Sequence, residues 1–518
     1  MTGTLSKSKK ELLEKLLHGR AISAASPRGI PRRREGGEAP ISYGQQQIWL
    51  HSQYSSQLPI YNEMITIHYY GALDRTAFER AFTEIIRRHE VWRTTFLWKN
   101  GDLVQHIEPS PAHISIPCLD VSTVPAEARE ATALLTVRTE ALAPYDLSVG
   151  PMYRPHLVRF SEEEHRLYLG LHHIIFDGVS LYGVLLPEMQ ALYEAFSQNK
   201  PSPLEDLPLQ YADYVVWHRR WVDEIAPKQL EYWRSKLKGA GGRDVLPIDY
   251  PRTETQSYRG ATERLALDAE LSPALKDLSQ RSGMTLFMTL LATLHVLIWA
   301  YTREEDVLIG CTSAGRDRSE TNHLLGFFLN TIVLRTDLSQ NPTFLELARR
   351  GGEELLSSLA HDGIPFESVV KALCAQRDSS RHPLFQIMFG FQPPLAPLKP
   401  NWKFAQMDLD LGVTKFDLHL ELDERAEGII GRFIYNADLF ERETIKGMIE
   451  TWRNIVHQVV ADPSRRISQL VPELTELRKT RFENERMDVA DVGSLASRPI
   501  GLIRSIQRLL WSNRASGS

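Results

Sequence analysis

Cysteine is scarce in this chain. Only three of its 518 residues are cysteine, Cys118, Cys311 and Cys374, and they are far apart, without metal-ligand or redox spacing. The sequence therefore predicts no zinc site, no other metal site and no dithiol chemistry. So little cysteine also fits a reducing cytoplasm, where we expect the protein to act.

Signals for export and for membrane insertion are lacking as well. The N-terminus is charged, and Lys7–Arg20 has no apolar core of the kind that a signal peptide needs. The most apolar stretch, Thr285–Tyr301, contains His295 and several threonines and is short for a membrane span. We expect it to form a helix buried on most sides, and we expect no membrane span.

An excess of positive charge is also absent, since the net charge is −5. This balance gives no general electrostatic reason to expect nucleic-acid binding. Gly310 and Gly315 do not form a nucleotide loop, because no Lys-Ser or Lys-Thr pair follows them. A chain of 518 residues is too long for one core, so we expect two domains or lobes.

Two adjacent histidines are the most informative feature that is present. Leu167, Leu169 and Leu171 alternate with other residues in a strand pattern that ends in His172 and His173. Strand alternation places these two histidines on opposite faces. Asp177 and Gly178 then give a turn signal, and apolar residues at helical spacing follow, at Leu181, Val184, Leu185, Met189, Leu192 and Phe196.

A neutral imidazole at such a strand end can take a proton from an amine or hydroxyl that attacks an acyl group. One histidine in this position is usually an ordinary hydrogen-bonded residue. A pair could suggest metal binding, but strand neighbours point apart and no further ligand stands at suitable spacing nearby. The whole segment from His172 to Gly178, between a strand and a helix, is rarer than either of these situations.

The His-His-x-x-x-Asp-Gly segment resembles the signature of the condensation domains of nonribosomal peptide synthetases, within the chloramphenicol acetyltransferase-like superfamily. The resemblance runs from about Pro40 to about Leu470 and involves further motifs in the order of that family. These segments are Ser42–Trp49, Arg88–Phe96, Tyr211–Trp217, Ile309–Arg316 with Gly326–Thr331, His382–Phe389, and Lys415–Leu418.

The resemblance implies a mixed α/β fold of two chloramphenicol acetyltransferase-like lobes, arranged as a V with a central tunnel. We therefore divide the chain into an N-terminal helix and linker (1–39), an N-terminal lobe (40–218), a C-terminal lobe (219–475) and a tail (476–518). Within the first segment, Leu5–Arg20 has an amphipathic pattern, and 21–39 is rich in Pro, Gly, Arg and Glu. The tail contains a basic amphipathic pattern after Pro499, which is typical of a docking helix or of a frayed terminus.

The same resemblance assigns roles to particular residues. His173 would face the tunnel and assist the attacking nucleophile, while His172 would pack locally. Asp177 would either orient His173 or form a structural ion pair, for which the resemblance favours Arg93 as partner. Gly178 would permit a special backbone shape or a close approach, and its N–H group could help to bind an oxyanion. Arg316, Ser313 and Trp49 are candidates for substrate binding, with Arg316 suited to a phosphopantetheine phosphate.

The implied activity is transfer of an acyl or peptidyl group from a phosphopantetheine thioester on a carrier protein to an amine or hydroxyl acceptor. The chain has no Gly-Gly-x-Ser carrier signature and no glycine-rich adenylation motif, so the donor would arrive on another protein. Carrier proteins, a neighbouring synthetase and a small acceptor are the expected partners, and no bound cofactor is expected. The alternatives are a free-standing acyltransferase that uses coenzyme A or a carrier, an epimerase, and a non-catalytic recruitment domain. Recruitment domains tend to lose the second histidine or the aspartate, and this chain keeps both.

Overall fold

The computed structural model of the chain describes residues 29–33, 37–55, 57–240, 246–374, 378–394, 398–405, 410–425 and 427–471. Almost all of these belong to one compact unit, Met1–Leu470. The helix expected at Leu5–Arg20 and the tail expected at 476–518, with its basic helix after Pro499, lie outside the described residues.

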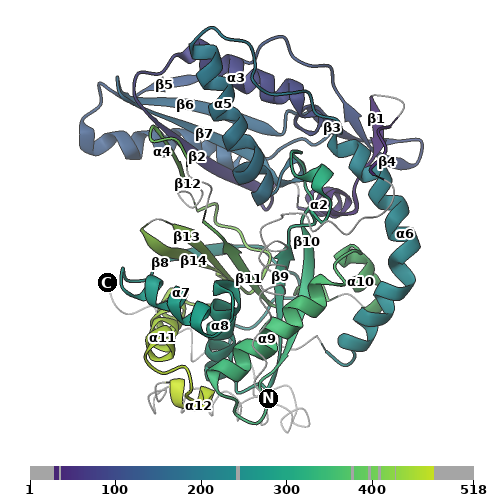
Figure 1. Ribbon diagram of the computed structural model, residues 1–518, viewed down its shortest axis with the longest axis vertical. Helices are drawn as coiled ribbons and strands as arrows, with labels where there is room; N and C mark the ends of the chain where they lie inside the picture. The colour runs from purple at the N-terminus through teal and green to yellow at the C-terminus, as the bar shows by residue number, and fades with distance from the viewer. Residues whose placement is uncertain are drawn as a thin grey trace, which may run out of the picture. The chain divides into compact units, whose positions relative to one another are not determined.

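The leucines that alternate before the two histidines lie in the central strand of a five-stranded sheet. Leu167, Leu169 and Leu171 of β7 (Glu164–His172) are buried under α3 (Arg75–Arg88) and α5 (Leu186–Ser197). Tyr168 points the other way and packs with α4 (Ala126–Leu142). Figure 1 shows this layering in the purple and teal part of the chain. The strand order is β12 (Trp402–Ala405), β2 (Asn62–Tyr70), β7, β6 (Tyr153–Ser161), β5 (Cys118–Asp120).

A smaller sheet and a packed N-terminal segment replace part of the predicted linker. Ile30 is 7% exposed and belongs to the first core, and the backbone N–H of Arg33 donates to Asp213 at 3.0 Å. The linker prediction is therefore wrong for these residues, whose apolar and charged side chains find specific partners. The same stretch ends in the edge strand of a three-stranded sheet, β1 (Glu38–Pro40), β4 (Asp102–Ile107), β3 (Thr94–Lys99).

The second large sheet has six strands and two unlike faces. Leu420 of β13 pairs with Phe433 of β14, and Trp452 of the helix α11 (Arg442–Ala461) lies against that face. Their neighbours Glu421 and Arg432 pair on the opposite face, which carries charge. The order is β10 (Asn330–Asp337), β9 (Asp306–Ser313), β11 (Ile387–Gln392), β13 (Leu418–Arg425), β14 (Gly428–Asn436), β8 (Gly260–Ala266).

Helices α7 (Leu271–Arg281), α8 (Leu286–Thr302) and α9 (Phe344–Leu359) complete this layer. The apolar stretch predicted at Thr285–Tyr301 is confirmed as the buried helix α8, and the strand β9 follows it. In the described part of the chain no single helix is long and apolar enough to cross a membrane. Helices α7 and α8 together meet that length and hydropathy, but they bend by 107°.

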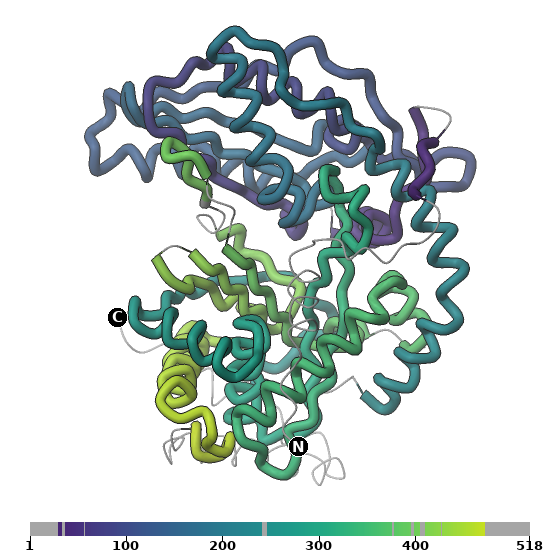
Figure 2. Tube along the Cα trace, in the orientation of Figure 1, coloured from purple at the N-terminus to yellow at the C-terminus, as the bar shows by residue number. Residues whose placement is uncertain are grey.

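Two elements tie the parts of the chain together. Helix α6 (Tyr211–Lys236) contacts β1 near its start and α10 (Phe366–Leu373) further along, so the lobe boundary predicted at residue 218 falls inside a continuous helix. Strand β12 follows the second sheet's β11 in sequence but pairs with β2 of the first sheet, Trp402 opposite Tyr69. In Figure 2 this short green segment lies beside the purple strand.

Candidate active site

The turn that follows β7 is held by α2 (Tyr43–Tyr54), the first helix in the described part of the chain. β7 ends at His172, opposite Asn62 of β2, and His173–Ile175 forms a single 3₁₀ turn. Helix α2 begins with a capping box between Ser42 and Gln45, and the Gln45 amide donates to the Ile174 carbonyl at 3.0 Å. The motif at 42–49 thus fixes the backbone directly after the histidines.

His172 is a packing residue in this arrangement. Its side chain is nearly buried, its Nδ1 accepts the Ile174 N–H at 3.3 Å, and its ring lies against Tyr61 and Tyr145. Burial, with the charges of His173 and Arg154, lowers its pKa to about 3. His172 does not line the cavity of about 1790 Å³ that residues of both large sheets enclose.

His173 presents one ring nitrogen to the large cavity. Its Nδ1 lies 3.0 Å from the Phe176 carbonyl oxygen, which can only accept, so Nδ1 carries the proton and Nε2 keeps a free lone pair. The ring stacks on Phe176 and meets Phe327 edge-on. Burial and then the charge of Lys415 lower the pKa of His173 to about 4, so the imidazole is neutral at pH 7.

The cavity has a volume of about 1790 Å³ and is lined from both large sheets. Tyr61, Glu63 and His173 come from the first sheet and the turns beside it, and His419 and Glu421 from the charged face of the second. The aromatic residues Tyr43, Tyr214, His218 and Trp221 also line it. A substrate in this space would contact groups from both halves of the unit.

Asp177 is wholly buried and holds two segments together. Its Oδ1 accepts the Ser180 N–H at 2.7 Å and an Arg316 N–H at 3.2 Å, and its Oδ2 accepts the Phe328 N–H at 2.9 Å. The neighbouring Ser180 hydroxyl donates to the Gly326 carbonyl at 2.8 Å. Asp177 therefore ties the histidine turn to the segment between β9 and β10, and the described contacts give it no hydrogen bond to His173.

The predicted ion pair between Arg93 and Asp177 is wrong. Arg93 lies 3.8 Å from Glu90 and donates to the Glu108 carbonyl, beside the three-stranded sheet. The partner of Asp177 is Arg316, with both side chains fully buried. The sequence feature that could have indicated this partner is the segment Ala314–Arg316, which directly follows the end of β9. Gly315 there has φ +59°, and a Cβ on it would stand 1.9 Å from the Phe328 carbonyl oxygen.

The three candidate substrate-binding residues also differ from expectation. Arg316 borders the cavity, but its guanidinium binds Asp177, Ser180 and the carbonyls of Thr321 and Leu324, so it is not free for a phosphate. The Ser313 hydroxyl donates to Asp362 at 2.6 Å, and Trp49 stacks on Trp98. Neither of these two lines the cavity.

Gly178 does line the cavity. Its φ lies outside the left-handed region, so the backbone itself does not require glycine. A Cβ there would stand 3.4 Å from the Tyr182 ring and 3.5 Å from the Gln392 side chain. These are ordinary van der Waals distances, so neither the special backbone shape nor the close approach expected from the sequence is required here, and the role of Gly178 stays a prediction.

Lys415 is one of several cavity residues that sequence reasoning passed over, although the motif that contains it was recognised. Its ammonium lies 4.6 Å from the centre of the Tyr61 ring, and the Tyr61 carbonyl accepts the backbone N–H of His173 at 2.8 Å. Burial lowers the pKa of Lys415, and the charge of Glu63 opposes that shift. A lysine before an alternating strand has no local feature that predicts such a position.

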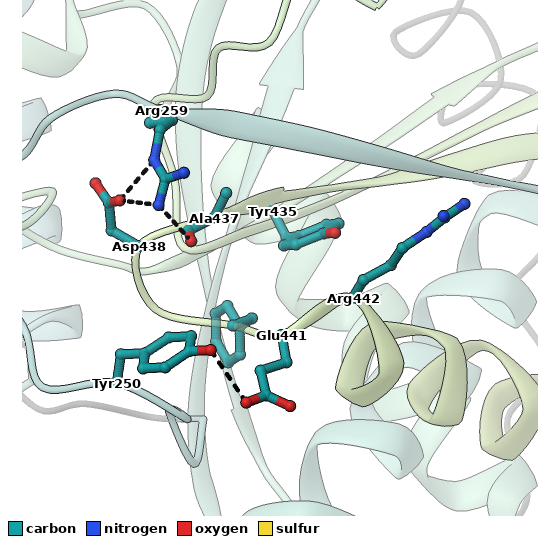
Figure 3. Close-up of a pocket in the computed structure, with 8 residues that line it drawn as sticks. Tyr250, Arg259, Tyr435, Ala437, Asp438, Glu441 and Arg442 are labelled. Atoms are coloured by element: carbon teal, nitrogen blue, oxygen red, sulfur yellow. Dashed lines mark hydrogen bonds and ion pairs between the residues drawn. The ribbon is translucent and has the colours of Figure 1, made fainter. Parts of the chain in front are cut away.

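A second pocket, of about 520 Å³, is shown in Figure 3. Its charged residues are already paired. Arg259 binds Asp438 and the Ala437 carbonyl, and the Tyr250 hydroxyl donates to Glu441 at 3.0 Å. Arg442 pairs with Glu263. The pocket contains neither histidine of the motif, so the larger cavity is the candidate active site.

Comparison with known proteins assigns the family. Residues 35–477 match the family model of the condensation domain. The chain is 40% identical over 446 residues to a linear gramicidin synthase of Brevibacillus parabrevis, covering 85% of this chain and 9% of that protein. It is 34% identical to phosphinothricin tripeptide synthetase PhsC of Streptomyces viridochromogenes, covering 94% of this chain and 45% of the relative. The chain thus spans less than half the length of these relatives.

Solved structures confirm the mixed α/β fold. The X-domain from teicoplanin biosynthesis matches with a TM-score of 0.75 at 27% identity, covering 86% of this chain and all of that one. The first condensation domain of the calcium-dependent antibiotic synthetase matches with a TM-score of 0.73 at 19% identity, covering 85% of this chain and all of that one. The chain belongs to the condensation domain family of nonribosomal peptide synthesis.

Proposed function

We propose that this protein transfers an acyl or peptidyl group from the phosphopantetheine thioester of a carrier protein to an amine, forming an amide. The observation that carries the proposal is the free Nε2 of His173 on a cavity lined from both sheets. The relatives that match most of this chain are synthetases of peptide products, which is consistent with amide formation.

The geometry supports a short proton route. As the amine nitrogen attacks the thioester carbonyl carbon, Nε2 of His173 accepts the proton that the nitrogen loses. The Nδ1–H bond to Phe176 fixes the tautomer and supports the charge that develops on the ring. Because His173 has a low pKa, it holds the proton only briefly and passes it to the thiolate that leaves.

The test is intact-protein mass spectrometry of carrier proteins loaded with a panel of acyl and aminoacyl groups, mixed with this protein and with aminoacyl carriers, free amines or alcohols. The expected result is movement of the acyl mass to an amine acceptor with wild type and its loss with His173→Ala. The same panel supplied as coenzyme A thioesters, or transfer to alcohols, would reveal a free-standing acyltransferase. Absence of transfer from every donor would contradict the proposal.

A recruitment role is the second candidate, because a 28% identical neighbour was solved as a complex of the X-domain with OxyB from teicoplanin biosynthesis. The two candidates make opposite predictions for one variant. A recruitment domain would give no acyl transfer, and His173→Ala would leave the output of the assembly line unchanged. The retention of both His173 and Asp177 favours catalysis.

A further inference from the structure

Lys415 lines the candidate active-site cavity and comes from the segment before β13, a strand of the second large sheet. It lies between β12 and β13, where its backbone is fixed: the Gln256 amide donates to the Lys415 carbonyl at 3.0 Å, and the Thr414 N–H donates to the Tyr258 carbonyl at 3.0 Å. Its ammonium is placed over the ring of Tyr61, the residue whose carbonyl holds the His173 backbone.

The ammonium of Lys415 has no counter-ion in the described part of the chain. Glu63 is the acid that acts on it, yet the two form no ion pair, and burial raises the pKa of Glu63. Arg432, another cation that lines the cavity, is already paired with Glu421. Lys415 is only partly exposed and lines the cavity, so its ammonium is available to a negative charge that appears there during function.

Three neutral imidazoles also lie within the electrostatic reach of Lys415. His51, His173 and His382 all line the cavity, and in each case burial and then the Lys415 charge lower the pKa. A fixed positive charge favours the anionic forms of a nearby reactant and disfavours its cationic forms. It therefore promotes loss of a proton from an acceptor ammonium as well as formation of an oxyanion.

We propose that Lys415 is a catalytic residue that stabilises the oxyanion of the tetrahedral intermediate. When the amine forms the C–N bond, the electron pair of the carbonyl moves to its oxygen, and the Lys415 ammonium donates to that oxygen. The pair then returns, the C–S bond breaks, and the thiolate takes the proton held by His173. The proposal rests on the proposed function and adds a residue to the same reaction.

The test compares Lys415→Met, Lys415→Arg and the control Lys403→Met in single-turnover transfer, with the donor and amine found in the mass-spectrometric panel at saturation. Lys403 is an exposed lysine of β12 outside the cavity. Removing one oxyanion donor typically costs about a hundredfold or more, so we expect that loss for Lys415→Met. The arginine variant should recover most of the rate, the donor affinity should change less than about threefold, and the control should match wild type.

A second readout needs no substrate. In the free protein, NMR titration of the His173 imidazole, identified by its loss in His173→Gln, should give a higher pKa in Lys415→Met than in wild type.

Three outcomes would overturn the assignment. Equal single-turnover rates for wild type and Lys415→Met would do so, as would an unchanged His173 titration. A loss confined to substrates that carry a carboxylate, seen only in their affinity, would make Lys415 a carboxylate-binding residue instead. Absence of transfer by wild type would remove the proposed function itself, so the two failures are distinct.

Discussion

Asp177 and Arg316 are 139 positions apart in sequence, yet they meet at 3.2 Å with both side chains fully buried. The pair joins the turn after β7 to the segment after β9. Because Asp177 also accepts the Phe328 N–H, it fixes Phe327, the preceding residue, whose ring borders His173.

Arg316→Met should therefore destabilise the protein strongly. The change leaves the Asp177 carboxylate buried without its cation, which costs roughly 3 to 5 kcal/mol. Arg93→Met serves as the matched comparison, since it removes one long ion pair and one hydrogen bond to a carbonyl, for about 1 to 2 kcal/mol. Urea unfolding followed by tryptophan fluorescence measures both. An equal or larger loss of unfolding free energy in Arg93→Met would instead support the Arg93–Asp177 ion pair expected from the sequence.

His173→Ala should reduce acyl transfer by about a hundredfold or more, because an acid–base group is removed. The lost contacts with Phe176 and Phe327 should cost only about 1 to 2 kcal/mol of stability, so the variant stays folded. His457→Ala is the matched control, as His457 is 54% exposed on α11. Transfer from a loaded carrier, measured by intact mass over time, gives the rates. A His173→Ala protein that works at the wild-type rate would exclude the imidazole from the reaction.

Acid should destabilise the fold through its buried neutral histidines. His295 of α8 donates from Nδ1 to the Leu291 carbonyl at 3.0 Å, and burial lowers its pKa to about 4. In the unfolded chain histidine binds a proton near pH 6.5. The contribution of His295 is therefore fully present above pH 6.5 and is lost as the pH falls towards 4, by up to about 3 kcal/mol.

The measurement is the difference in unfolding free energy between wild type and His295→Leu across pH 4 to 7. A difference is needed because Asp362 and Glu367, whose pKa values are raised to about 7 by burial, act in the opposite direction. The variant should lose less stability on acidification than wild type. Parallel pH profiles for the two proteins would show that His295 is not held neutral in the fold.

Trp402→Ala should weaken the link between β12 and the first sheet. The indole is 7% exposed and lies against the rings of Tyr69, Phe78 and Tyr193. Removing a large buried side chain costs about 3 to 5 kcal/mol. Thermal unfolding should show a clear fall for Trp402→Ala and almost none for Lys403→Met. A small effect of both would mean that β12 adds little to the first sheet.

The local pattern predicted the elements well and the long-range contacts poorly. The alternation at Leu167–Leu171 and the apolar run at Thr285–Tyr301 correspond to β7 and α8, because hydrophobic period is a local property. The predicted partner of Asp177 was Arg93 and the observed partner is Arg316. Either arginine could neutralise the Asp177 carboxylate, and only the three-dimensional path of the chain decides which one lies beside it. Lys415 was missed for the same reason, since the Tyr61 ring that it contacts and the His173 imidazole whose pKa it lowers lie far from it in sequence.

The pairing of β12 with β2 has a consequence for synthesis on the ribosome. The edge of β2 has no partner on that side until the chain has grown past Ala405, although the strand itself is made early. During that interval the nascent protein exposes unpaired backbone groups and the aromatic site that Trp402 later fills. A fragment that stops before residue 400 should therefore self-associate through this edge, and chaperone demand during expression should be highest before β12 emerges.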